Sequence, residues 1–152
     1  MIYPGYLALE THPDRPGIVK MVKSIKNPQV SVPLSDGGKV RFILHFNDLE
    51  RAFMLAQSKM SKHIEDLDNN LYKRHLAVAM GDLETLELNH TPVWKDPDLT
   101  EAELAEMEQE IQINRRWLTR RDRFVEILKW GIILYLIFNF FSPLIAMIYN
   151  KL

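Results

Sequence analysis

The strongest constraint on this chain is a run near its C-terminal end, from Trp130 to Tyr149, in which no residue is charged. As an α-helix this run extends roughly 30 Å, at about 1.5 Å per residue, which matches the hydrocarbon core of a bilayer. The alternative is a helix buried in a protein core, which requires more surrounding chain than 152 residues supply. The sequence therefore predicts a transmembrane helix over residues 129–150.

Three aromatic residues and two helix-perturbing residues characterise this predicted span. Trp130, Tyr135 and Tyr149 have amphipathic rings of the kind that favour membrane interfaces. Pro143 removes a backbone donor and predicts a kink. Asn139 places an amide near the middle of the membrane, where an unpaired polar group is costly. Either a partner helix satisfies this amide, or its own helix or a water defect does, and the sequence leaves both interpretations open.

The two flanks of the predicted span differ in charge. Only Lys151 follows it, whereas six basic residues precede it: Arg115, Arg116, Arg120, Arg121, Arg123 and Lys129. Because positive flanks stay on the cytoplasmic side of a membrane, we expect a tail-anchored protein whose N-terminal domain is cytoplasmic. The arginines act either as topology determinants alone or also as ligands for anionic lipid headgroups.

Residues 99–128 are predicted to form a helical stalk between the span and a soluble domain of residues 1–95. The turn-forming sequence Lys95-Asp96-Pro97-Asp98 ends that domain. Thr100, with Glu103 three residues later, is a capping-box pattern that begins the helix. Within this helix, side chains recur at alternating spacings of three and four, at Leu104, Met107, Ile111, Asn114 and Leu118. This spacing predicts either a short coiled coil in a homodimer or a single amphipathic stalk that lies on its own domain or on a partner.

The soluble domain is predicted to be α+β, with a small antiparallel sheet packed by a helix. Strands are expected over residues 6–12 and 18–22, joined by a turn over 13–17 that contains two prolines and a glycine. A helix over residues 14–25 is the competing prediction, and we disfavour it because Pro-Gly would occupy its first turn. The clearest strand covers residues 39–46.

A helix is predicted over residues 47–64, with Asn47 as its N-cap and Glu50 three residues later. Its expected core face comprises Leu49, Phe53, Ala56, Met60 and His63. Beyond it, Gly81-Asp82 predicts a break between a short strand or helix and a helical turn over residues 82–88.

Two runs of the predicted sheet carry a resemblance to a known family. Gly5-Tyr6-Leu7-Ala8-Leu9 and His12-Pro13-Asp14-Arg15-Pro16-Gly17-Ile18-Val19-Lys20-Met21 resemble the opening of GIY-YIG nuclease-like domains. In that family a tyrosine-bearing strand turns through an Asn-Pro…Pro-Gly loop into a second strand, and a third strand and a helix with a catalytic glutamate follow. The resemblance implies this fold over about residues 5–65.

The catalytic residues implied by the resemblance are not in place. The first-strand tyrosine of the family falls at Ala8, although Tyr6 is close by, and no arginine occurs in residues 24–38. The metal-binding glutamate falls near Phe53, with Glu50 one turn away. The second motif departs as well, since its aromatic residue and glycine fall near Lys20 and Val22. Metal-assisted phosphodiester hydrolysis needs a carboxylate on the metal, so the resemblance implies a non-catalytic relative.

Other chemistry-bearing residues form no catalytic signature. The chain has no cysteine, and its five histidines lack the spacing of a metal site: His12, His45, His63, His75 and His90. We therefore predict no catalytic residue, metal or cofactor. Basic residues of the predicted sheet form either an anion-binding face, for nucleic acid or a membrane surface, or an ordinary solvated face: Arg15, Lys20, Lys23, Lys26, Lys39 and Arg41.

Together these features favour a single-pass membrane protein whose cytoplasmic domain is a non-catalytic adaptor or accessory subunit of a membrane-associated assembly. Its protein partner is expected to contact the stalk or the transmembrane helix. The alternative is a membrane-tethered nuclease or nucleic-acid-binding module of the GIY-YIG type.

Overall fold

The computed structural model describes residues 3–28, 30 and 37–149, and for residues 142–149 it describes only the backbone. The chain divides into two compact units, residues 1–114 and residues 115–152. The first unit is an α+β domain, and the second consists of helix.

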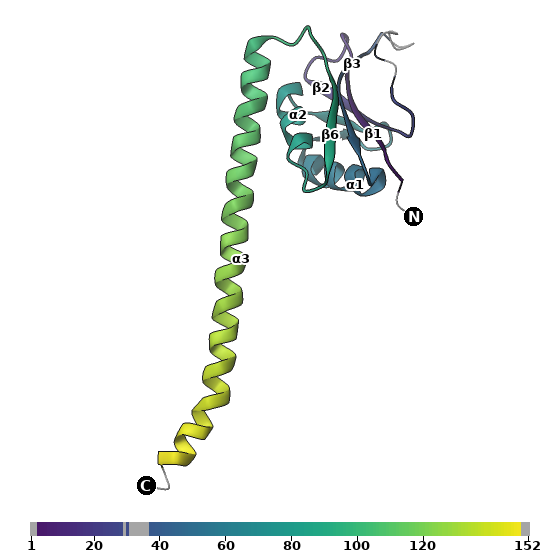
Figure 1. Cartoon of the computed structure of the whole chain (residues 1–152). Helices are drawn as coiled ribbons and strands as arrows, with labels where there is room; N and C mark the ends of the chain where they lie inside the picture. The colour runs from purple at the N-terminus through teal and green to yellow at the C-terminus, as the bar shows by residue number, and fades with distance from the viewer. Residues whose placement is uncertain (1–2, 29, 31–36, 150–152) are drawn as a thin grey trace. The chain divides into compact units, whose positions relative to one another are not determined.

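The first unit contains a six-stranded antiparallel sheet with the strand order β4-β5-β2-β1-β3-β6. Figure 1 labels four of these strands, β1, β2, β3 and β6. The strands are β1 (Gly5–Thr11), β2 (Ile18–Ser24), β3 (Lys39–Phe46), β4 (Ile64–Asp66), β5 (Leu71–Lys73) and β6 (His90–Lys95). Although β1 comes first in the chain, it pairs with β2 on one side and with β3 on the other. The predicted α+β class is therefore confirmed.

The two faces of the sheet have different cores because successive side chains of a strand point in opposite directions. Leu7 and Leu9 of β1 and Phe42 of β3 are fully buried in the main core, on the face that carries the helices. Ala8 and Ile43 belong to a smaller cluster on the other face. The main core is thus the one that can hold helices against the sheet.

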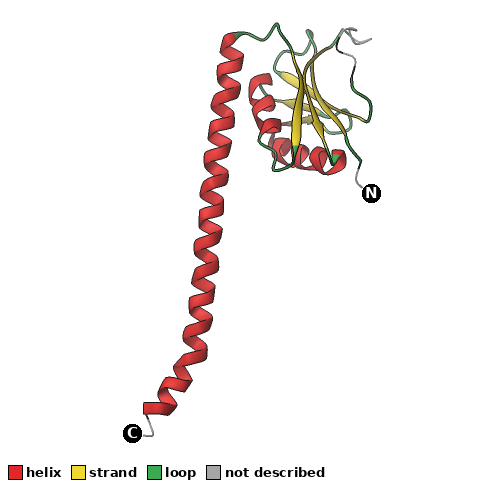
Figure 2. Ribbon diagram, in the orientation of Figure 1, coloured by secondary structure: helices red, strands yellow, loops and turns green. Residues whose placement is uncertain are grey.

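Helices α1 (Leu49–Met60) and α2 (Leu76–Glu84) lie on the same side of the sheet, and the short 3₁₀ turn η1 (Ser61–His63) follows α1 (Figure 2). The first turns of α3 (Glu101–Tyr149) also contribute to this core. Met107 and Ile111 of α3 are each only 6% exposed and belong to the same buried cluster as the side chains of α1 and α2. Two side chains of the predicted stalk pattern are therefore buried in the core of the chain's own domain.

Several local predictions for this unit are confirmed. The three predicted strands correspond to β1, β2 and β3, with bounds that differ by at most two residues, and the competing helix over residues 14–25 is wrong. The turn between β1 and β2 has Gly17 at a φ of 75°, a conformation that favours glycine. The predicted capping box is also formed: the backbone N–H of Thr100 donates to Oε2 of Glu103 at 2.8 Å, and the N–H of Glu103 donates to Oγ1 of Thr100 at 3.2 Å.

The predicted bounds of the first helix are wrong. Its N-cap is Asp48, whose side chain accepts a hydrogen bond from the backbone N–H of Arg51 at 3.2 Å, rather than Asn47. Both residue types cap helices well, and burial of Leu49 in the first turn accompanies the later start. The helix ends at Met60, so the predicted core residue His63 lies in η1 instead.

The break predicted at Gly81 is also wrong, because α2 continues through it. The pattern of apolar and polar residues gives no signal for β6, which contains Pro92. Among the strands that the structure describes, β6 is at the edge and pairs with β3, and edge strands are where proline is tolerated within a sheet.

Candidate functional site

The uncharged part of α3 is exposed in the second unit. α3 is the one helix among the described residues that is long and apolar enough to cross a membrane, and none of its most apolar stretch is buried. Phe138 and Phe140, for example, are 73% and 77% exposed. The predicted interface residues Trp130 and Tyr135 are exposed as well. Within the described residues this stretch is thus not part of a buried core, and an apolar surface of this extent indicates a contact with lipid or protein.

Asn139 has a hydrogen-bond partner within its own helix. Its Nδ2 donates to the backbone carbonyl oxygen of Tyr135 at 3.0 Å, one turn earlier. Of the two interpretations that the sequence left open, the structure shows the one that needs no second chain. The side chains of Pro143 and Tyr149 lie outside the described part, so the kink at Pro143 stays a prediction.

The predicted basic flank lies entirely in the second unit and is exposed: Arg115, Arg116, Arg120, Arg121, Arg123 and Lys129. Arg121 forms an ion pair with Asp122 at 3.1 Å, and its guanidinium lies 5.6 Å from the ring centroid of Trp117. The segment of residues 115–129 that contains these side chains is called the basic segment below.

A buried carboxylate connects the first turns of α3 with the other helices. Asp82 of α2 is only 2% exposed, and its Oδ2 lies 2.6 Å from Nη2 of Arg74. Its Oδ1 lies 3.5 Å from Nζ of Lys59 on α1 and accepts a hydrogen bond from Nδ2 of Asn114 on α3 at 3.3 Å. Burial lowers the pKa of Lys59 below its ordinary value, although Asp82 opposes this. One carboxylate thus joins three helices.

A second buried carboxylate lies where β6 leads into α3. Asp96 is only 3% exposed, and its Oδ2 lies 2.9 Å from Nζ of Lys39 and 3.0 Å from Nε of Arg41, both on β3. Burial opposes its ionisation, but the hydrogen bond from the backbone N–H of Asp98 and the ammonium of Lys39 outweigh burial, so the pKa of Asp96 lies below its ordinary value. Arg41 also lies 3.9 Å from Glu103 of the capping box.

The side chains of the predicted anion-binding face are not gathered on one face. Lys20 and Lys23 are three residues apart on β2 and so point to opposite sides of the sheet. Each is already paired, Lys20 with Glu10 at 3.7 Å and Lys23 with Glu50 at 2.8 Å, while Lys39 and Arg41 contact Asp96. Anion binding by these residues with Arg15 stays a prediction, and the ion pairs favour the ordinary solvated face.

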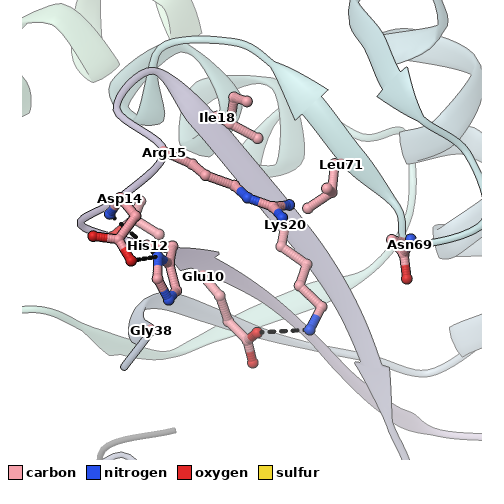
Figure 3. A pocket seen from close by; sticks show the side chains of 10 residues that line it. Glu10, His12, Asp14, Arg15, Ile18, Lys20, Gly38, Asn69 and Leu71 are labelled. Atoms are coloured by element: carbon pink, nitrogen blue, oxygen red, sulfur yellow. Dashed lines mark hydrogen bonds and ion pairs between the residues drawn. The ribbon is translucent and has the colours of Figure 1, made fainter. Parts of the chain in front are cut away.

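A cavity of about 470 Å³ opens beside the turn between β1 and β2 (Figure 3). Its polar walls include the Glu10–Lys20 ion pair, His12, and the guanidinium of Arg15. The backbone N–H of Asp14 donates to Nδ1 of His12 at 3.2 Å. The walls carry both signs of charge, and two of the pairs lie within them, Lys20 with Glu10 at 3.7 Å and His12 with Asp14 at 3.7 Å.

The positions implied by the family resemblance have structural roles in the first unit. Phe53 is 9% exposed and lies in the main core, and the carboxylate of Glu50 is held by Nζ of Lys23 at 2.8 and 2.9 Å. The described residues contain no group of three or more side chains that could hold a metal ion. No family model, curated protein or solved structure matches the chain. The resemblance to GIY-YIG domains therefore stays an expectation from the sequence.

The sequence did not predict that Asp82, Asp96 and Arg74 form buried or half-buried ion pairs with several partners. A carboxylate at position 82, within the apolar sequence of residues 76–83, is the available signal, because a buried charge requires a partner. Which cation supplies that partner depends on tertiary contacts, since Arg74 is close in sequence but Lys59 is not.

Proposed function

We propose that the chain is a single-pass membrane protein, anchored through the uncharged part of α3, whose α+β domain is a non-catalytic accessory subunit of a membrane-associated assembly. The observation that carries the proposal is a contrast within one helix. Residues 101–114 contribute buried side chains and ion-paired carboxylates to the domain, whereas the stretch after the basic segment exposes large apolar side chains all round. A helix that is apolar on every side needs lipid or a large protein interface.

The direction of insertion is supported by charge. The basic segment carries six Lys or Arg residues and two acidic residues, and it lies on the N-terminal side of the uncharged run. Positive charge is retained on the cytoplasmic side, which favours a cytoplasmic α+β domain. The non-catalytic role is supported by the burial of Phe53 and by the ion pair that occupies Glu50.

The absence of cysteine from the chain makes the anchor and its direction directly testable. Single variants Ser61→Cys, on the exposed turn η1, and Lys151→Cys each introduce one thiol for a membrane-impermeant maleimide. In intact cells the Ser61→Cys thiol should stay unlabelled until the membrane is opened. Alkaline carbonate should leave the full-length protein in the membrane pellet. Release by carbonate would refute the anchor, and labelling of Ser61→Cys in intact cells would refute the direction.

The accessory role requires a partner at the anchor. A photo-crosslinking amino acid in place of Phe138 or Phe140 should give a discrete protein adduct in native membranes, because these exposed rings lie on the surface that a partner would cover. The same photo-crosslinking amino acid in place of exposed Lys62 of the domain is the control, and it shows how many adducts arise from random collision. If the helix positions crosslink only to lipid, the protein is anchored but has no intramembrane partner.

A further inference from the structure

We propose that Arg120 and Arg123 bind the phosphate group of anionic phospholipids at the membrane surface. This inference rests on the proposed anchor and names the ligand of its basic flank. The two arginines are three residues apart on α3, so they share one helix face and lie within reach of a common ligand. Both are exposed, and neither forms an ion pair with any residue that the structure describes.

The surroundings of the two arginines leave their charge unmatched. Of the two acidic residues of the basic segment, Asp122 projects from another face, roughly 130° around the helix axis from the midpoint of the two arginines. Glu126 is three residues after Arg123 and so lies near it, but the described residues show no ion pair between them. Asp122 is already paired with Arg121, which also lies over the ring of Trp117. Basic side chains of the domain differ in this respect, since Lys23, Lys39 and Arg41, for instance, each contact a carboxylate.

The position along the helix selects lipid as the ligand. Arg123 and Arg120 precede Trp130, the start of the uncharged run, by about 10 and 15 Å along a helix, and long arginine side chains can extend toward the interface. The pair Arg115 and Arg116 lies more than about 20 Å from Trp130, so the same extension leaves its guanidinium groups farther from the interface. A guanidinium binds phosphate through two parallel hydrogen bonds, which makes two adjacent arginines a suitable phosphate site.

The matched test compares two double variants that remove the same charge. Full-length protein in mild detergent is mixed with equal amounts of phosphatidylglycerol and phosphatidylcholine, and native mass spectrometry counts the lipids that stay bound. At about 1 kcal/mol per basic residue, or roughly fivefold, the wild type should favour phosphatidylglycerol at least fivefold. Arg120→Gln with Arg123→Gln should reduce the preference to about one, whereas Arg115→Gln with Arg116→Gln should leave it unchanged.

The outcomes separate lipid binding from topology. If the arginines act only through total positive charge, both double variants should behave alike, and equal loss or no loss in both would overturn the proposal. So would a wild type without preference for phosphatidylglycerol. Release of the wild type by carbonate would instead refute the anchor itself. All four arginines are exposed, and far-UV circular dichroism of each variant confirms that the fold is retained.

Discussion

Replacement of Gly81 by alanine tests how closely α2 and the first turns of α3 pack. A Cβ at this position would lie 2.9 Å from Cβ of Glu110 and 3.1 Å from the backbone oxygen of Met107. Neither neighbour is the flexible end of a side chain, so one helix would have to move. An isolated helix predicts the opposite result, because alanine is favoured over glycine in a helix interior by up to about 1 kcal/mol.

The magnitude follows from these two opposing effects. Overpacking in a well-packed interior costs about 1–3 kcal/mol, which exceeds the gain in helix propensity. We therefore expect Gly81→Ala to lower the free energy of unfolding by about 1–2 kcal/mol, which corresponds to a fall in Tm of roughly 4 to 15 °C for a domain of this size.

The assay is equilibrium denaturation of the full-length protein in mild detergent, followed by the fluorescence of Trp94. Trp94 packs against the smaller core, and replacement of Trp117 and Trp130 by phenylalanine leaves it as the sole reporter. Gly131→Ala is the matched control, because a Cβ there meets nothing within 4 Å. If Gly81→Ala is as stable as the wild type or more stable, α3 does not pack on α2 at the distance described.

Three further predictions concern the stability of the first unit. Asp82→Asn leaves Arg74 and Lys59 without their buried carboxylate and should lower the free energy of unfolding by about 3 kcal/mol in chemical denaturation, and a loss below about 1 kcal/mol would contradict its central role. The stabilisation from ionised Asp96 is present above its unfolded pKa of about 3.9 and is lost as pH falls through its lower folded pKa. The wild type should therefore lose more stability between about pH 4 and pH 2 than Asp96→Asn does. If the unfolding free energies of the two proteins fall in parallel over this range, Asp96 makes no such contribution. Gly17→Ala should cost about 1 kcal/mol through backbone conformation alone, since nothing lies within 4 Å of the added Cβ, and Gly17→Asn should recover part of it; equal thermal stability of the wild type and the alanine variant would refute the backbone argument.

Local signals in the sequence were sufficient for much of the fold. The strand at residues 39–46 and the turn that ends in Gly17 depend on neighbouring residue types, and the structure has both. The capping box of Thr100 and Glu103 is also local, because its hydrogen bonds join residues three apart. The uncharged run of α3 could be recognised for the same reason, since its length and composition are sequence properties.

The errors arise where tertiary contacts decide between local alternatives. Asn47 and Asp48 are both good N-caps, and the sequence alone does not tell which of them precedes the first buried turn. Gly81 suggested a helix break, yet its role is to let α3 approach α2. The partners of Asp82 and Asp96 come from distant segments, so a sequence pattern can indicate that each needs a cation but cannot name Lys59 or Lys39.

Both edges of the sheet are poor templates for another strand. β6 contains Pro92, which has no backbone N–H to donate, and β4 at the opposite edge is only three residues long. Two copies of the domain would therefore gain little from joining their sheets end to end. Any self-association of the domain is thus expected to use side-chain surfaces or helices, and chains at high local concentration have little tendency to polymerise through their sheet edges.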